Sequence, residues 1–186
     1  SEMCIRDRLK PFQVNPLFTA SLSQMPKGLH NLYGGRVIET VKTFLVSADL
    51  ELGPAHLCIG ASPGEKKHFS PETVLLDARV LWHAMQSFDT KIPMTHDGYL
   101  KLFQLENPDL GYDRILLDEA QDTNPVTQQL VDLQPSQLVY VGDEHQAIYG
   151  FRGASNAMAL LEAEEEHLLS GSFRFGPAVA EVANFI

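Results

Sequence analysis

Two clusters of polar residues each follow a short apolar segment, and such clusters can act on a bound ligand. The first begins with Asp118 and Glu119 after residues 112–117, and the second begins with Gly142 after residues 137–141. Short apolar runs without alternation predict strands of a parallel sheet that is covered on both faces. Such sheets bind ligands at the carboxyl ends of their strands, so we expect the two clusters to line one crevice.

Adjacent carboxylates at a strand end suit the hydrolysis of a phosphate chain. Asp118 can hold Mg²⁺ together with substrate phosphates, because this hard cation prefers oxygen ligands. Glu119 can orient or deprotonate a water that attacks a γ-phosphate. An isolated Asp-Glu pair is also compatible with a solvated strand end, so the second cluster has to decide between the two interpretations.

The second cluster adds groups that suit phosphate and nucleic acid. Gln146 follows Asp143 by three residues and offers an amide that can contact both phosphate and water. Tyr149, Phe151 and Arg152 come next. Aromatic faces beside a guanidinium are the components of a platform on which single-stranded nucleic acid stacks.

Three strings in this chain resemble known helicase motifs. They are DEAQDTNPVTQQL from Asp118, VGDEHQAIYGFRGA from Val141 and SFRF from Ser172. In this order they resemble motifs II, III and IV of superfamily 1 DNA helicases of the UvrD/Rep type, and they are most similar to the F-box DNA helicase branch. The resemblance implies an α/β fold, namely part of a RecA-like P-loop NTPase domain with a parallel sheet, preceded by a helical insertion subdomain.

The resemblance also implies roles for individual residues. The residues expected to act in ATP hydrolysis are Glu119, Gln146 and Arg174. The cofactors are expected to be ATP and Mg²⁺, with Asp118 as metal ligand and Gln121, Asp122, Gln146, Phe173 and Arg174 at the nucleotide. The partner is expected to be single-stranded DNA, or DNA with single-stranded tails, contacted by His96, Tyr149, Phe151 and Arg152, and Lys101 could touch the DNA backbone as well.

Several of these residues have a structural alternative. His96 could equally be the solvent-facing start of a helix, and Tyr149 could pack in the core. Phe173 alternates with Phe175 and could lie on the buried side of a strand. Arg152 could pair with one of the many nearby acids.

The resemblance predicts a division of the chain into three parts. Residues 1–109 would be the mostly helical insertion, of which residues 1–8 could be foreign sequence. Residues 110–166 would be the RecA-like part with motifs II and III, and residues 167–186 would begin the second RecA-like domain with motif IV. A further helix is expected from Ala154 to Glu164.

Apolar spacing predicts two helices within the first part. One is expected from Gly35 to Ser47. Another should start at Ser70-Pro71-Glu72, with an apolar stripe that includes Trp82 and extends to Phe88.

A third helix is expected over residues 97–105, ended by Asn107-Pro108. Residues 58–68 resemble a phosphate-binding loop only superficially. Three residues, not four, separate Gly60 from Gly64, and no hydroxyl residue follows the lysines, so we expect an exposed loop there.

Composition limits the other possibilities. The 186 residues carry a net charge of −10, of which residues 1–109 contribute 11 Lys/Arg and 12 Asp/Glu, and residues 110–186 contribute 3 and 12. DNA would therefore be bound through local contacts rather than through overall attraction. Two cysteines do not suggest a disulfide framework, and neither a membrane-spanning run nor a signal-peptide pattern is present. We expect a cytoplasmic protein, or a nuclear one in a eukaryote, that does not associate with membranes.

The sequence as a whole suggests an internal fragment of an ATP-dependent DNA helicase that couples Mg·ATP hydrolysis to movement on single-stranded DNA and to unwinding. It contains no phosphate-binding loop and neither of motifs V and VI. A P-loop ATPase of another class is one alternative, although the Tyr-Gly-Phe-Arg-Gly string from Tyr149 argues against it. The other alternative is a non-catalytic relic or interaction module that keeps the fold without binding ATP.

Overall fold

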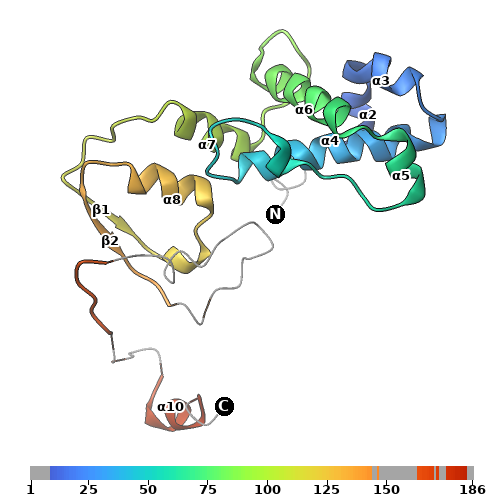
Figure 1. Cartoon of the computed structure of the whole chain (residues 1–186). Coiled ribbons are helices and arrows are strands. Elements are labelled where there is room, and N and C mark those ends of the chain that lie inside the picture. Colours follow the sequence, from blue (N-terminus) through green and yellow to red (C-terminus); the bar gives the residue numbers. More distant parts are fainter. Residues whose placement is uncertain (1–8, 144–145, 147–162, 170, 172–174, 184–186) are drawn as a thin grey trace.

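A computed structural model describes residues 9–143, 146, 163–169, 171 and 175–183 of the chain (Figure 1). A helical part comes first and a small α/β part follows it. The helical part contains α2 (Pro11–Val14), η1 (Asn15–Phe18), α3 (Thr19–Ser23), η2 (Lys27–Leu29), α4 (His30–Leu45), η3 (Pro54–His56), α5 (Pro63–His68), α6 (Pro71–Gln86) and α7 (His96–Leu105). The α/β part contains β1 (Arg114–Leu117), η4 (Ala120–Asp122), α8 (Pro125–Asp132) and β2 (Gln137–Tyr140), and α10 (Pro177–Ala183) lies further along the chain.

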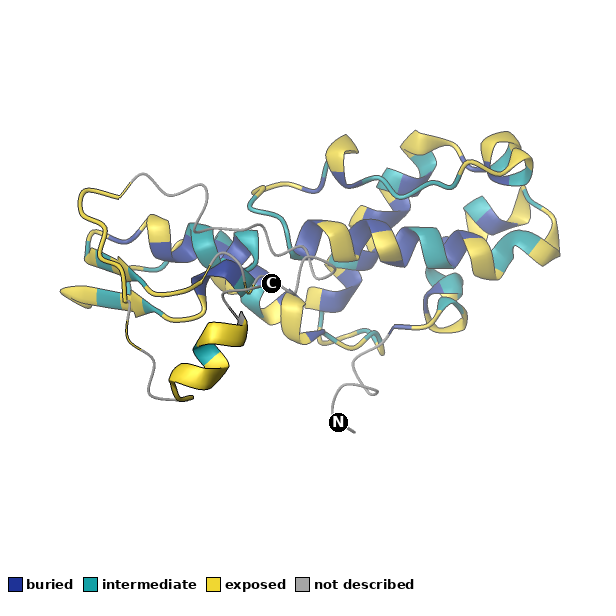
Figure 2. Cartoon of the chain, turned by 90° about the horizontal axis from the view of Figure 1, so that it is seen from below, coloured by how far each residue is buried: buried dark blue, intermediate teal, exposed yellow. Residues whose placement is uncertain are grey.

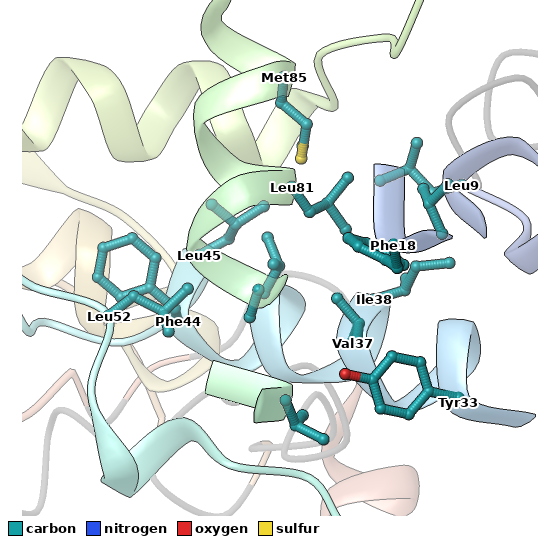
Figure 3. Packing of buried hydrophobic residues seen from close by; sticks show 14 of the residues in the cluster. Leu9, Phe18, Tyr33, Val37, Ile38, Phe44, Leu45, Leu52, Leu81 and Met85 are labelled. Carbon is teal, nitrogen blue, oxygen red and sulfur yellow. The ribbon is translucent and has the colours of Figure 1, made fainter. Parts of the chain in front are cut away.

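The core of the helical part forms where α4 packs against α6 (Figures 1 and 3). Val37, Val41 and Leu81 are fully buried there. Removing apolar side chains of this size from water contributes about 1.5–3 kcal/mol each. This part of the chain therefore has a hydrophobic core of its own.

Helix α4 begins at His30, five residues before the predicted start at Gly35. The two glycines that suggested a boundary lie inside the helix. A Cβ atom at Gly34 would come within 2.4 Å of Asn15 Oδ1 and 3.3 Å of Pro11 Cβ. The absent side chain lets the segment from α2 to η1 pack directly on α4, so Gly34 serves close packing rather than a turn.

A buried hydrogen bond ties α4 to α6. The Tyr33 hydroxyl donates to Asp77 Oδ2 at 2.6 Å, and both residues are buried. Burial raises the pKa of Tyr33, and the nearby Asp77 carboxylate raises it further. The phenol thus stays protonated and remains a donor to the carboxylate.

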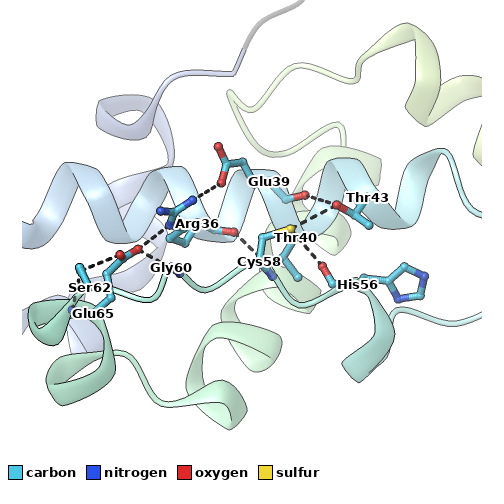
Figure 4. A network of polar contacts seen from close by, with 9 residues as sticks. All are labelled: Arg36, Glu39, Thr40, Thr43, His56, Cys58, Gly60, Ser62 and Glu65. Atoms are coloured by element: carbon cyan, nitrogen blue, oxygen red, sulfur yellow. Dashed lines mark hydrogen bonds and ion pairs between the residues drawn. The ribbon is translucent and has the colours of Figure 1, made fainter. Parts of the chain in front are cut away.

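The prediction of an exposed loop over residues 58–68 is wrong in part, because α5 forms within this segment. Ser62 Oγ accepts a hydrogen bond from the Glu65 backbone N–H at 3.3 Å, and Glu65 is itself buried. Its carboxylate accepts from Arg36 Nε at 2.6 Å and from the Gly60 N–H at 3.2 Å (Figure 4). Arg36 thereby lowers the pKa of Glu65. The glycine loop therefore wraps a carboxylate of its own chain, which an isolated loop pattern does not reveal.

Helix α6 begins after Ser70, as predicted, and Trp82 packs partly buried against the core. Phe88 was wrongly included in its buried stripe. The helix ends at Gln86, and Phe88 is 106% exposed. Helical periodicity no longer applies past the last turn, so the side chain points into solvent.

Lys101 was wrongly predicted to reach toward a DNA backbone. It is fully buried on α7, and its ammonium donates to the Ser47 carbonyl at 3.0 Å and to the Asp49 carbonyl. The ammonium also lies 4.2 Å from the centre of the Phe44 ring. Lys101 therefore secures the turn after α4.

The α/β part has the topology that the sequence predicts. Strands β1 and β2 are parallel and pair Arg114 with Gln137 through Leu117 with Tyr140. Helix α8 connects them, and the Asn124 side chain caps it by accepting from the Thr127 N–H at 2.9 Å.

The sheet differs from the expectation in one respect, because the described residues do not cover it on both faces (Figure 2). Along both strands, exposed and half-buried residues alternate, and Leu116 is 69% exposed. Two short strands and one helix bury only one side of a sheet.

Among the described residues no helix is long and apolar enough to span a membrane.

Candidate nucleotide site at the strand ends

The ends of β1 and β2 meet, as the sequence predicts. The Val141 N–H donates to the Leu117 carbonyl at 2.8 Å, and the Ala120 N–H donates to the Val141 carbonyl at 3.0 Å. The hydrogen-bond ladder between the two segments thus extends one step past the strands before the segments diverge. Both polar clusters therefore begin at the same edge of the sheet.

The first cluster opens with a sharp backbone turn. Glu119 adopts a left-handed conformation with φ 52° and ψ 41°, which is uncommon for a residue with a side chain. Its backbone N–H donates to Asp118 Oδ1 at 2.9 Å. Both carboxylates are exposed. Strained backbone of this kind is found preferentially at functional sites, where it aims a side chain.

Gln121 connects the two clusters. It is 1% exposed, so both ends of its amide need hydrogen-bond partners. Its Nε2 donates to Glu119 Oε2 at 2.7 Å, and its Oε1 accepts from the Asp143 N–H at 3.1 Å. One buried amide thus fixes the Glu119 carboxylate relative to the start of the second cluster.

Gly142 makes this connection possible. A Cβ atom there would lie 2.4 Å from Gln121 Oε1 and 3.2 Å from the Ala120 backbone nitrogen. Real Cβ atoms essentially never come as close as 2.4 Å to another atom, so a larger residue at position 142 would have to displace the buried Gln121 amide. The role of Gly142 was not predicted from the sequence. Its position directly after a predicted strand was the available signal.

Gln146 lies on the same side of the site. Its Nε2 donates to Asp143 Oδ2 at 2.6 Å, and its side chain is exposed. The chain from Glu119 through Gln121 and Asp143 to Gln146 is therefore continuous in hydrogen bonds. Asp122 lies half-buried in η4, directly after Gln121.

The donor set of this edge fits a magnesium ion with a phosphate ligand. Exposed carboxylates are the oxygen ligands that Mg²⁺ prefers, and it is commonly held by one or two of them with phosphates and waters completing the octahedron. Over the described part of the chain, no three His, Cys, Asp or Glu side chains gather as a preformed metal cage. Asp118 would be the residue that holds the ion.

Of the other predicted site residues, the structure describes His96 alone. His96 is exposed at the first position of α7, whose cap is Thr95 Oγ1 accepting from the Gly98 N–H at 3.1 Å. It thus belongs to the helical part. The five remaining residues lie outside the described residues, and they are Tyr149, Phe151, Arg152, Phe173 and Arg174.

Both clusters lie in a stretch of the chain that matches a known family. The model of the UvrD/REP helicase N-terminal domain matches residues 103–167, which include both clusters. This segment of the chain is therefore similar to the UvrD-like helicase family.

Two curated relatives of the chain are named as DNA helicases. F-box DNA helicase 1 of chicken is 39% identical over 159 residues, covering 80% of this chain and 16% of the relative. F-box DNA helicase protein 1 of fission yeast is 39% identical over 165 residues, covering 84% of this chain and 18% of the relative. The chain thus spans less than a fifth of either relative. No solved structure shows a significant match to it.

Proposed function

We propose that this chain is part of an ATP-dependent DNA helicase that couples hydrolysis of Mg·ATP to movement on single-stranded DNA and to duplex unwinding. The observation that carries the proposal is the buried Gln121 amide, which joins Glu119 to Asp143. A strand end that served only folding would need neither this bridge nor the left-handed Glu119. A non-catalytic relic is disfavoured for the same reason.

Each residue of the site has a distinct task in this proposal. Asp118 holds the magnesium ion, which when bound neutralises charge on the β- and γ-phosphates. Glu119 orients the attacking water and accepts its proton. Gln121 keeps the Glu119 carboxylate in place, since an unrestrained side chain would have to find this orientation at each turnover. Gln146 contacts the γ-phosphate.

The proposed coupling to DNA follows from the same hydrogen bonds. Gln146 and Asp143 precede Phe151 in one continuous segment, so a change at the γ-phosphate can reach a residue that stacks on a base. Arg174 would stabilise the charge that develops on the transferred phosphoryl group. Phe173 would pack against the adenine. The phosphate-binding loop of a P-loop NTPase has no counterpart in these 186 residues, so we place it elsewhere in the longer protein.

The test is Glu119→Gln in the longer protein that carries this sequence. We expect DNA-stimulated ATP hydrolysis to fall at least about 10²-fold, the lower range for removal of a general base. ATP affinity, measured by fluorescence titration, should stay within a few-fold because Asp118 remains. The matched control is Glu106→Gln, the same change at an exposed carboxylate after α7. Turnover near the control rate would remove Glu119 from the mechanism.

A second measurement tests the DNA contact. Phe151→Ala should weaken binding of single-stranded oligonucleotides by about 1–3 kcal/mol, the usual contribution of one stacked base. It should lower the DNA-stimulated ATPase rate more than the basal rate. An unchanged affinity in a folded variant would indicate that Phe151 packs in the core.

A further inference from the structure

An apolar groove runs along the outer side of α6, away from the strand ends. It has a volume of about 440 Å³, and its floor includes Leu76, Val80 and Ala84. Leu76 is 60% exposed and Val80 is 41% exposed. Buried positions such as Val74 and Leu81 face the core instead, so α6 is apolar on two sides. A second apolar side on a surface helix indicates a contact that the described residues do not supply.

The turn after α6 lengthens this surface. Thr90 Oγ1 donates to the Ala84 carbonyl at 2.5 Å, and the Asp89 N–H donates to Ser87 Oγ at 3.2 Å. Ile92 packs against the core beyond the turn. These contacts fix the turn, in which Ser87 and Thr90 line the groove and Phe88 is fully exposed. The turn thus adds one exposed apolar side chain directly after the helix.

The spacing of these side chains suits a helical partner. Leu76, Val80 and Ala84 follow one another at intervals of four residues along α6. A row at this interval forms a ridge that packs between the ridges of another helix. From Leu76 to Ala84 this row spans eight residues, or about 12 Å, which corresponds to about two turns of a partner helix.

The charges around the groove indicate which sign of charge a partner should carry. The lining residues include Arg79 and His83 and no acid, in a chain that has 24 acidic against 14 basic side chains. The Arg79 guanidinium donates to the Leu52 carbonyl at 3.1 and 3.2 Å, and no described carboxylate forms an ion pair with it. Arg79 is exposed, so a partner at this surface can approach its positive charge. Complementarity requires acidic residues on the partner.

We infer that the α6 groove binds an amphipathic helix of another protein, one with an apolar stripe flanked by Asp or Glu. A second copy of this chain fits less well, because a two-fold contact would place Arg79 and His83 against their own counterparts. Single-stranded DNA fits less well, because exposed Leu76 and Val80 offer nothing to phosphates. This surface is independent of the proposed ATPase site.

The experiment uses the 186-residue chain and two synthetic 18-residue helical peptides. Both peptides have one leucine stripe, flanked by Glu in the first and by Lys in the second. Fluorescence anisotropy of the labelled peptides should give saturable binding of the Glu peptide and at least about tenfold weaker binding of the Lys peptide. Equal affinities, or no saturation of the Glu peptide up to about 1 mM, would overturn the inference.

Two variants assign the binding to the groove. Val80→Glu should weaken binding of the Glu peptide at least about tenfold, since it places a like charge among the apolar lining residues. His83→Glu should weaken binding of the Glu peptide and strengthen binding of the Lys peptide. Leu133→Glu is the matched control, because it changes an aliphatic residue that is 55% exposed and does not line the groove. Fluorescence of Trp82 checks that each variant is folded.

Other occupants would be visible in the same series. Sedimentation that shows dimers in the parent chain and monomers in Val80→Glu would assign the groove to a second copy and refute the inference. Binding of a labelled oligonucleotide that Val80→Glu abolishes would refute it as well. An effect of Leu133→Glu as large as that of Val80→Glu would show that the peptides bind elsewhere.

Discussion

The buried Lys101 should make the stability of the helical part depend on pH in an unusual direction. Burial lowers the pKa of its ammonium to about 8, although the nearby Asp49 carboxylate partly opposes this. In the unfolded chain the same lysine has a pKa of about 10.5. Between these two values the folded protein has released a proton that the unfolded chain still holds. The free energy of unfolding must therefore rise as the pH increases from about 8 toward 10.5.

The magnitude follows from the difference between the two pKa values. Each unit of difference corresponds to about 1.4 kcal/mol, so the unfolding free energy should increase by about 2–3 kcal/mol from pH 7 to pH 10. The neutral amine can still donate to the Ser47 and Asp49 carbonyls, so deprotonation does not break the turn. Burial also raises the pKa of Tyr33 and of Tyr140, which lowers stability, but only above about pH 10.

Urea denaturation of the chain, monitored through Trp82, measures this effect. Trp82 is the only tryptophan and lies 5.9 Å, ring centre to ring centre, from Phe44, the ring that also contacts Lys101. Lys101→Met should remove the rise with pH, and Lys42→Met, the same change at an exposed position of α4, should keep it. A parental curve that is flat or falls from pH 7 to 10, or an equal rise in Lys101→Met, would refute the reasoning.

Three further predictions concern the buried bridge, the strand ends and the isolated chain. Tyr33→Phe should lower the unfolding free energy by about 1–3 kcal/mol, because Asp77 would stay buried without its donor; a loss as small as that of Tyr99→Phe, an exposed tyrosine, would contradict this. Gly142→Ala should destabilise the strand ends and reduce ATP turnover in the longer protein more than ATP binding, because a Cβ would displace Gln121; wild-type turnover would show that the bridge is not needed. The isolated chain should not hydrolyse ATP and should bind it no more tightly than about 1 mM, because it has no phosphate-binding loop, and calorimetric titration of Mg·ATP giving micromolar affinity would reveal a site that the sequence does not indicate.

Local sequence determined the elements that carry the candidate site. Apolar runs predicted β1 and β2, and the Asn124-Pro125 and Ser70-Pro71 pairs predicted the starts of α8 and α6. Each of these signals acts within a few residues, through backbone hydrogen bonds and side-chain caps, so it can be read without a partner. The convergence of the two clusters followed as well, since parallel strands end at the same edge. The predicted division of the chain at residues 109 and 166 remains a prediction.

The tertiary structure decided how polar and small residues are used. Lys101 looks like a surface cation in the sequence. In the structure it lies on the buried face of α7 beside Gln104, where the two side chains donate to three backbone carbonyls and an aromatic ring contacts the lysine. Gly34 looks like a helix boundary, yet a neighbouring segment packs against it. Gln121 is one amide among several, and only the approach of Gly142 makes it the bridge between the clusters. In each case the deciding contact lies far along the chain, and the sequence states which groups are available but not which ones meet.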